Sequence, residues 1–424
     1  MRGPGAWLGP RRLAAIASKA VPLLGPRVAA RLTARSFRHY PAKGGPTLLV
    51  LSRPTFDKDI VELRARTGLG FVVIEAGFTR FQEGLLARPR REQTEYQAAA
   101  RGIDPRTDPQ VAYARELLRL ARRLAPVDGV LSANFDYWQD FGFKVLCREE
   151  DLVFGVLCRE NAVIPFAIDF VRERYTRIPY RFEGDFIATA SASPQRLFRE
   201  LGIAPPEHIH DTGLPRYDAW SDRIAAARGG PRPYVTLLTF THGYRADATF
   251  REVAGIFVEA ARACADTGVT FLIKTKERVD TEALARMVGD ALPPNVVIDA
   301  TIDMATALEG SRAIVGYNSL ALIDALLSGS SIVLPAWGEC ATEGPLCMYP
   351  RTPESEALLD YADGPGALSA LLEAAARGRG EAGAPVDAAT LDYVRRYVTY
   401  DPGVSISERF AALVGRYVDA RRGG

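Results

Sequence analysis

A short polar stretch between two apolar runs is the first place in the sequence where chemistry is expected. Val315–Pro335 has the sequence VGYNSLALIDALLSGSSIVLP, so Asn318 and Ser319 follow a β-branched run and precede an apolar segment that carries one acid, Asp324. The spacing of the apolar residues predicts a strand, a helix and a second strand, with a very short first turn. Such a turn places Asn318 and Ser319 at the carboxyl edge of a parallel sheet, where α/β folds bind anionic and sugar-like ligands.

Ser319 and Asp324 each allow two interpretations. Ser319 either contacts a phosphate or serves only as the N-cap of the helix, a role that serine often fills. Asp324 lies five residues further on and is flanked by Ile323 and Ala325. A carboxylate in such an apolar helix favours a specific role, either with a ribose hydroxyl or with a backbone group of a neighbouring loop.

A second polar turn follows the run YVTLL at 234–238, which predicts a buried strand. Thr241, His242 and Arg245 lie together in this turn. We expect them to reach the same ligand as Asn318 and Ser319. The alternative for His242 is a turn residue that bonds its own backbone.

A third group of polar residues follows the run VTFLI at 269–273 and consists of Lys274, Lys276 and Glu277. Because side chains alternate along a strand, the two lysines are expected to face the same way. Two ammonium groups beside helix N-termini suit a diphosphate. The alternative is that both are ordinary solvated charges at a strand end.

Strands alternate with helices along most of the chain, which predicts an α/β fold with parallel sheets covered by helices. In the first half we expect strands at 46–52, 70–77, 128–134 and 163–170, and a helical segment at 140–161. The pattern restarts after a linker rich in turn residues, so two tandem doubly wound, Rossmann-like domains are predicted. The predicted parts are a basic amphipathic leader at 1–44, a first domain at 45–227, a second domain at 228–384 and C-terminal helices at 385–424.

Length and charge set further bounds. A chain of 424 residues exceeds one ordinary core, which agrees with two domains. The net charge is only +2, but the first 55 residues contain ten Lys or Arg and no Asp or Glu. This leader is interpreted as an amphipathic anchor on an anionic membrane face, as a transit peptide, or as a loosely ordered basic segment. The five cysteines are scattered, so neither a disulfide framework nor a zinc site is indicated, and a reducing cytoplasm fits them.

Four segments resemble bacterial surface-polysaccharide enzymes. DTGLPRYDAW at 211–220 resembles a TGxPRxD turn, and ENAVIPFAIDF at 160–170 resembles a GIPFV strand. YVTLLTFTHGYR at 234–245 is similar to the strand that opens the nucleotide-binding domain of this family, and GYNSLALIDALLSGSSIVLP at 316–335 resembles a later segment of that domain. The family comprises capsule-polysaccharide transferases of the GT-B kind, CDP-glycerol glycerophosphotransferases and, more distantly, sugar-nucleotide 2-epimerases. At the position where this family often has His-Pro, this chain has Lys276-Glu277. The difference favours a divergent glycosyltransferase over an epimerase or a glycerophosphotransferase.

The resemblance implies GT-B architecture and transfer of a sugar from a nucleotide-activated donor to a cell-surface or capsular polysaccharide, with no metal and no cofactor. It adds two residues of the TGxPRxD turn to the donor site. The expected donor contacts are Gly213, Arg216, Thr241, His242, Arg245, Lys274, Lys276, Asn318, Ser319 and Asp324. The expected catalytic residues are Asp136, His242 and Glu277.

Asp136 is the preferred general base because it follows the predicted strand at 128–134, and Asp169 and Glu173 are the alternatives. A purely structural aspartate at this place is an equal interpretation. Other functions stay open: a polyol-phosphate transferase, a sugar-nucleotide epimerase, or an inactive glycan-binding relative. The expected partners are a nucleotide-activated sugar, a glycan or lipid-linked acceptor and the anionic inner membrane, without nucleic acid. The expected location is the cytoplasm, with peripheral attachment to that membrane as an option.

Overall fold

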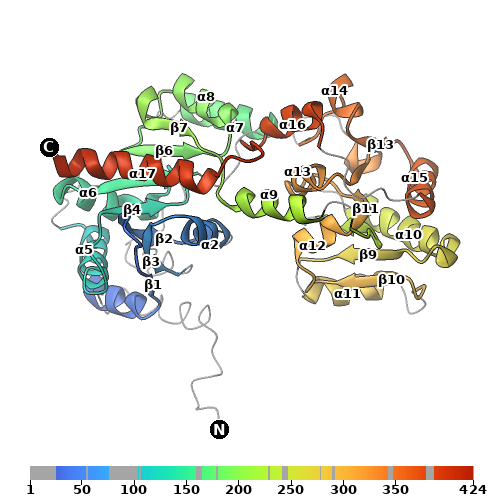
Figure 1. Cartoon of the computed structure of the whole chain (residues 1–424), viewed down its shortest axis with the longest axis horizontal. Helices are drawn as coiled ribbons and strands as arrows, with labels where there is room; N and C mark the ends of the chain where they lie inside the picture. Colours follow the sequence, from blue (N-terminus) through green and yellow to red (C-terminus); the bar gives the residue numbers. More distant parts are fainter. Residues whose placement is uncertain are drawn as a thin grey trace, which may run out of the picture. The chain divides into compact units, whose positions relative to one another are not determined.

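The computed structural model describes residues 25–53, 56–75, 104, 107–158, 165–177, 180–227, 230–240, 247–276, 278–288, 292–341, 347–378 and 386–423. The chain divides into two compact units (Figure 1). Unit 1 consists of Met1–Ala162, Phe170–Asp218 and Asp401–Gly424, and unit 2 consists of Val163–Asp169 and Ala219–Tyr400. Apart from the short segment Val163–Asp169, the chain leaves unit 1 inside helix α9 (Arg216–Ala227) and returns to it for the last helix.

Unit 1 contains a seven-stranded sheet in the order β1-β3-β2-β4-β5-β6-β7. Its strands are β1 Arg38–Tyr40, β2 Thr47–Leu51, β3 Gly70–Ile74, β4 Gly129–Ser132, β5 Val153–Leu157, β6 Phe186–Thr189 and β7 Ile209–Asp211. Neighbouring strands run parallel except for β1 and β3, which pair antiparallel. All residues of the central strands β2, β4 and β5 are buried, as expected for strands covered on both faces.

The helices of this part of the chain are a helix at 25–34, α2 Phe56–Arg66, α5 Pro109–Ala121, α6 Phe141–Glu149, α7 Pro165–Arg177, α8 Ala192–Glu200 and α17 Ile406–Gly423, with short 3-10 helices η2 Trp138–Asp140 and η3 Pro206–His208. Helix α5 shows why such helices begin where they do. Asp108 accepts hydrogen bonds from the backbone of Gln110 and Val111, and a proline occupies the first turn. Helix α17 contacts β5 and α2 and runs across one face of the sheet (Figure 1).

Two elements differ from the sequence prediction. The helix expected over 140–161 ends at Glu149, because Asp151 adopts a left-handed φ of 54° and the apolar run VFGVL then pairs as β5. Gly155 permits this pairing, since a Cβ there would lie 2.1 Å from the Phe186 ring. The strand expected at 163–170 is wrong: α7 begins at Pro165, a position where proline is compatible with a helix start.

Unit 2 contains a six-stranded, fully parallel sheet in the order β10-β9-β8-β11-β12-β13. Its strands are β8 Tyr234–Leu238, β9 Thr270–Lys274, β10 Val296–Asp299, β11 Ser311–Val315, β12 Ser331–Pro335 and β13 Asp360–Ala362. The strand, helix and strand predicted from Val315–Pro335 are therefore β11, a short helix and β12.

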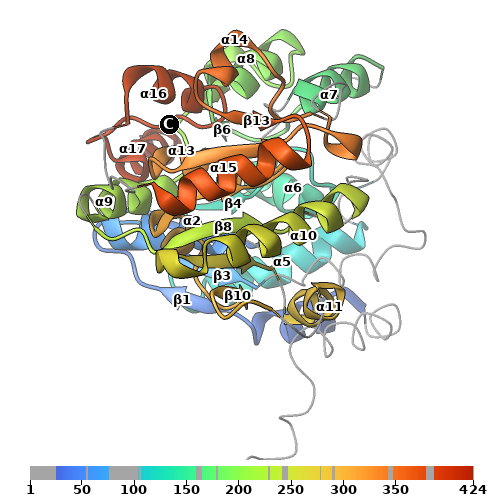
Figure 2. The same ribbon diagram turned by 90° about the vertical axis from the view of Figure 1, so that its right-hand side faces the viewer.

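The helices of unit 2 are α10 Asp247–Ala263, α11 Arg278–Val288, α12 Met304–Glu309, α13 Ala321–Leu327, α14 Pro353–Glu356, α15 Pro365–Arg377 and α16 Ala388–Arg395, with 3-10 helices η4 Ala265–Thr267 and η5 Gly338–Cys340. Figure 2 shows α10 and α15 side by side over one face of the sheet. Between them and the sheet lies a core that includes Leu237, Phe257, Phe271 and Leu372.

Candidate functional site

Each sheet reverses its strand order at one point. In unit 1 the chain proceeds from β2 to β3 on one side and then places β4 on the other side of β2. In unit 2 it proceeds from β8 to β9 and then places β11 on the other side of β8. In open α/β sheets, ligands bind outside the carboxyl ends of the strands at such a reversal, because the loops on its two sides diverge there. The residues after β8 and β11, and those after β2 and β4, are therefore the candidates.

The turn after β11 contains Asn318 and Ser319, as predicted. Asn318 has a left-handed φ of 42° and is buried, with its Oδ1 accepting a hydrogen bond of 2.9 Å from the Met348 backbone N–H. Ser319 Oγ accepts from the Ala321 N–H at 3.3 Å, although the N-cap of α13 is Leu320, and the Ser319 carbonyl accepts from the Tyr349 hydroxyl at 2.6 Å. The turn is thus fastened to the segment around Met348 and Tyr349.

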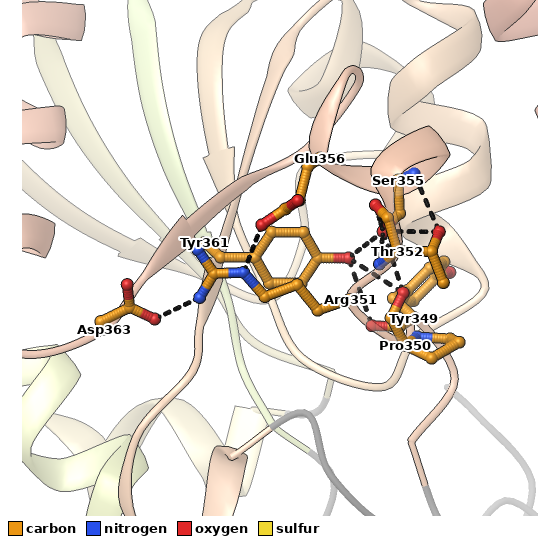
Figure 3. Close-up of polar contacts among 8 residues, drawn as sticks. All are labelled: Tyr349, Pro350, Arg351, Thr352, Ser355, Glu356, Tyr361 and Asp363. Atoms are coloured by element: carbon orange, nitrogen blue, oxygen red, sulfur yellow. Dashed lines mark hydrogen bonds and ion pairs between the residues drawn. The ribbon is translucent and has the colours of Figure 1, made fainter.

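That segment is held in turn by a compact polar cluster (Figure 3). Arg351 pairs with Glu356 and Asp363, each at 2.6 Å, and its guanidinium lies 5.3 Å from the centre of the Tyr361 ring. The Tyr361 hydroxyl bonds Ser355 Oγ at 2.8 Å, and Thr352 and Ser355 form a reciprocal capping box. Because the cluster fixes the residues directly after Tyr349, it supports the shape of the Asn318–Ser319 turn.

Aromatic rings lie on both sides of the reversal in unit 2. The ring of Phe240, just after β8, lies 5.5 Å from that of Tyr317 and 5.0 Å from that of Phe250. Phe240 and Tyr317 are half-buried, and burial raises the pKa of Tyr317 to about 12. Partly buried aromatic rings at this edge are side chains of a kind that can stack against a nucleobase.

Lys274 and Lys276 have different environments. Lys274 is buried at the end of β9, where its Nζ donates to the carbonyls of Thr275 at 2.7 Å and Ala300 at 3.1 Å. Lys276 lies beyond the strand and is exposed. Since β8 separates β9 from β11, the end of β9 lies about 10 Å from the end of β11 in the sheet. The bonds of Lys274 to Thr275 and Ala300 connect the loops after β9 and β10. Lys276 is the cation of this pair that faces solvent.

Other predicted residues of unit 2 fall in different places. Asp324 lies on α13 and is half-buried between the buried side chains Ile323 and Ala325. Its role toward a ligand remains a prediction. Thr241, His242, Arg245 and Glu277 lie outside the described residues, so their donor-binding and catalytic roles also remain predictions.

Glu339, after β12, has a role that the sequence did not indicate. Its carboxylate accepts hydrogen bonds from the Thr249 backbone and hydroxyl, both at 2.7 Å, and from the Ala248 backbone at 3.3 Å. The Thr249 bonds hold the pKa of Glu339 below its usual value. An acid from a loop 90 residues away thus caps the first turn of α10, a contact that spacing alone cannot reveal.

In unit 1, Asp136 lies in the turn after β4, at the reversal point. The Tyr175 hydroxyl donates to its Oδ2, and Arg174 lies 3.8 Å from the same oxygen. The Asp136 side chain is 13% exposed, which leaves it accessible while both α7 partners restrain it. By contrast Asp169 and Glu173, the alternative bases, are exposed on α7. Of the three, Asp136 is the one that lies in the turn after β4, and its role as the base remains a prediction.

A buried polar network next to Asp136 was missed by the sequence analysis. Lys144 Nζ donates to the Phe135 carbonyl and to the Tyr180 hydroxyl, both at 3.0 Å, and Tyr180 donates to the same carbonyl at 2.7 Å. Burial lowers the pKa of Lys144. These bonds fix the backbone directly before Asp136. The available signal was Lys144 itself, a charged residue among the apolar positions of α6.

A second part of this network reaches β2. Arg53 donates to Asp140 at 3.3 Å, and Ser132 donates to the other oxygen of the same carboxyl group. Asp140 is fully buried, and burial raises its pKa. Perturbed titrating groups at a reversal point are typical of functional sites, although structural ion pairs produce them as well.

The TGxPRxD turn follows β7, the last strand of the first sheet, at the carboxyl edge of that sheet. Gly213 has a φ of 81°, which favours glycine. Arg216 makes a bidentate pair with Asp59 of α2, at 3.0 and 2.7 Å. Asp218 accepts from the backbone N–H groups of Ile406 at 2.7 Å and Ser407 at 2.8 Å, at the start of α17. The charged residues of the motif thus have partners within unit 1, and donor contacts by Gly213 and Arg216 remain predictions.

Within the described ranges, no group of three or more His, Cys, Asp or Glu side chains is arranged to hold a metal ion. The same residues include no helix that is both long and apolar enough to span a bilayer.

Comparison with known proteins identifies the fold. No family model matches the sequence, and no curated protein does. Among solved structures the chain is similar to a variant of the wall teichoic acid polymerase TagF, with a TM-score of 0.51, 10% identity and coverage of 97% of this chain and 98% of that chain. It is also similar to the glycotransferase of kitacinnamycin, with a TM-score of 0.49, 15% identity and coverage of 90% of this chain and 100% of that chain. A third similar structure is the UDP-GlcNAc 2-epimerase from Neisseria meningitidis bound to UDP-GlcNAc, with a TM-score of 0.46, 12% identity and coverage of 88% of this chain and 100% of that chain.

The fold is that of the GT-B enzymes, an α/β chain with two Rossmann-like domains, and the prediction from the sequence is confirmed. The similar structures include a glycotransferase and a UDP-GlcNAc 2-epimerase. At such low identities the likeness concerns the fold.

Proposed function

We propose that the protein is a glycosyltransferase that moves a sugar from a nucleotide-activated donor to a surface or capsular glycan. The observation that carries the proposal is the strand reversal between β8 and β11 in unit 2. The polar turn Asn318–Ser319, which accepts hydrogen bonds from Met348 and Tyr349, lies at this reversal. The aromatic pair Phe240 and Tyr317 lies there as well. A nucleotide needs a flat apolar partner for its base and polar groups for its ribose and phosphates, and this edge offers both kinds.

The chemistry follows from what the transfer requires. An acceptor hydroxyl attacks the activated sugar carbon, the bond from that carbon to the diphosphate oxygen breaks, and the hydroxyl proton passes to a base. We assign the base to Asp136, which Tyr175 and Arg174 restrain. The negative charge on the leaving diphosphate is assigned to cationic side chains of unit 2, of which Lys276 is the exposed example among the described residues.

A thermal-shift screen of the full chain against CMP, CDP, UDP, GDP and their sugars tests the proposal. A ligand at 100 times its dissociation constant stabilises by about 2.7 kcal/mol, which corresponds to a melting-temperature increase of roughly 5 °C or more. We expect one nucleoside diphosphate and its sugar to produce this increase.

NMR of the selected donor with the enzyme alone then separates the function classes. The proposal predicts that the sugar keeps its configuration and is only slowly hydrolysed when no acceptor is present. Inversion at C2 of the sugar would instead identify an epimerase. CDP-glycerol is added to the thermal-shift screen, where a response to it alone would identify a polyol-phosphate transferase. No response to any of these ligands would contradict the proposal and favour an inactive relative.

A further inference from the structure

A basic hollow lies on unit 1, and none of the residues assigned to the transfer reaction lines it. It has a volume of about 600 Å³ and is formed by the helix at 25–34 and by α5. The two helices are joined by a buried hydrogen bond of 2.7 Å between the hydroxyls of Thr33 and Tyr113. The charged residues that line the hollow are Arg27, Arg31, Arg115, Glu116, Arg119 and Arg123. We call this the arginine groove.

The single carboxylate of the arginine groove is already neutralised. Glu116 is 10% exposed and accepts two hydrogen bonds of 2.7 Å from Arg119 and one of 3.2 Å from Arg31. Its pKa is lowered to about 2, chiefly by the bonds from Arg119. Glu116 therefore orients two guanidinium groups and leaves the groove with four more positive than negative charges.

The remaining cations point to an external anion. Arg115 pairs with Glu149 at 2.7 Å, but both side chains are exposed, so water screens the pair. Within the described ranges, no carboxylate lies within 4.0 Å of Arg27 or Arg123. Arg27 and Arg31 are four residues apart on their helix. Arg115 and Arg119 have the same spacing on α5, and Arg123 follows four residues later, just after its end. The five therefore form two rows of exposed guanidinium groups. Such rows match several phosphates side by side, and arginine binds phosphate through two parallel hydrogen bonds.

We propose that the arginine groove binds the phosphate headgroups of an anionic membrane surface. A bilayer is favoured over a soluble polyanion because two exposed apolar side chains adjoin the arginines: Val28 is 38% exposed and Leu124 is 46% exposed. Cations next to exposed apolar residues are typical of proteins that lie in the headgroup layer. The absence of any acid from the first 55 residues of the sequence adds to the attraction.

This site goes beyond the leader expected from the sequence, because three of its arginines belong to residues 115–123 rather than to 1–44. It extends the peripheral membrane position expected from the leader, but it does not depend on the transfer reaction, because its test measures lipid binding.

The test is co-sedimentation of the full chain with vesicles of phosphatidylcholine alone or of phosphatidylcholine mixed with the anionic lipid phosphatidylglycerol. The groove variant is Arg27→Gln, Arg115→Gln and Arg123→Gln, which keeps both partners of Glu116. The matched control is Arg172→Gln, Arg177→Gln and Arg196→Gln, three exposed arginines of which Arg172 has an exposed pair with Glu200, as Arg115 has with Glu149. Circular dichroism verifies that both variants fold.

We expect the wild type to bind the anionic vesicles and not the neutral ones. Each arginine near such a surface contributes roughly fivefold to the partition coefficient, so the groove variant should bind on the order of 100-fold more weakly. The control should bind like the wild type. Equal binding by the groove variant and the wild type, equal losses in both variants, equal binding to neutral vesicles, or no binding at all would each overturn the proposal.

Discussion

Asp136 is the side chain on which the proposed chemistry most depends. It has three properties that a general base needs: a place at the strand reversal of unit 1, partial access to solvent, and partners that fix its orientation. Lys144 and Tyr180 hold the carbonyl of the preceding residue, so the backbone of the turn is fixed as well. A single residue can therefore be tested without large changes to its surroundings.

Asp136→Asn should remove catalysis and preserve the fold. The amide keeps the shape and can still accept from Tyr175, but it cannot take a proton. We expect turnover of the donor to fall by about 10²- to 10⁴-fold, with little change in melting temperature. Asp169→Asn, on the exposed part of α7, is the control and should keep wild-type turnover. If the two variants turn over equally fast, Asp136 is a structural residue.

Asp324→Asn tests the unit 2 prediction at the same scale. If the carboxylate accepts a hydrogen bond from the donor, losing its charge should cost about 1.5–3 kcal/mol of binding, which is roughly 10- to 100-fold in affinity. The melting temperature should hardly move, and the exposed Asp266→Asn should change neither quantity. Calorimetric titration of the donor measures the affinity. A lower melting temperature with unchanged affinity would assign Asp324 to the support of α13 alone.

At the scale of elements, the TGxPRxD turn acts as a junction within unit 1. Arg216 connects the start of α9 to α2, and Asp218 caps the start of α17. These partners lie 157 and 188 residues away in the sequence. The turn therefore brings the C-terminal helix back to the first sheet, which explains why α17 belongs to unit 1.

Arg216→Gln should destabilise unit 1 strongly. Asp59 is fully buried, so the substitution leaves a buried carboxylate without its charged partner, at a cost of about 3–5 kcal/mol. Arg172→Gln removes a similar pair with Glu200 that is exposed, and it should cost about 1 kcal/mol or less. Urea denaturation measures both. Similar losses in the two variants would show that the Arg216–Asp59 pair has no special role in stability.

The contact between β7 and α17 should make stability depend on pH. His210 Nε2 lies 3.0 Å from the Tyr417 hydroxyl, and burial is the main cause that lowers the pKa of His210 from 6.5 to about 4. Because the folded state favours the neutral ring, the unfolded chain binds more protons between these values, so stability decreases as pH falls from 6.5 toward 4. His210→Gln should make this decrease shallower in melts between pH 7 and 5. An unchanged slope would contradict this account.

The parts of the fold that the sequence predicts well are those with local signals. The buried runs at β2 and β8, and the strand, helix and strand at 315–335, follow from apolar periodicity. Strand β5 was missed because a continuous apolar run cannot be distinguished from a buried helix by its period alone. The Glu339 cap and the arginine groove depend on which distant elements pack together, and the sequence carries no local signal for that. The Asp136 network had one local signal, the charged Lys144 among the apolar positions of α6, but its partners Phe135 and Tyr180 follow only from the packing.

At the scale of the whole molecule, the proposed tasks are divided between the two units. The proposed base and the arginine groove belong to unit 1, and the proposed donor site belongs to the strand reversal of unit 2. Each unit is compact and has its own reversal point, so ligand binding to one unit can be detected by a change in hydrogen exchange of that unit's segments.

Hydrogen exchange of the full chain with saturating CDP, UDP or GDP is the most direct test of the central claim. We predict that one of these nucleotides slows amide exchange in unit 2 at 316–321 and 347–350, because the braced turn and its supporting segment become ordered around the ligand. Exchange at 274–276 should slow as well if Lys276 contacts the diphosphate. No protection with any of the three nucleotides, or protection confined to unit 1 segments such as 133–137, would contradict the placement of the donor and with it the proposed function.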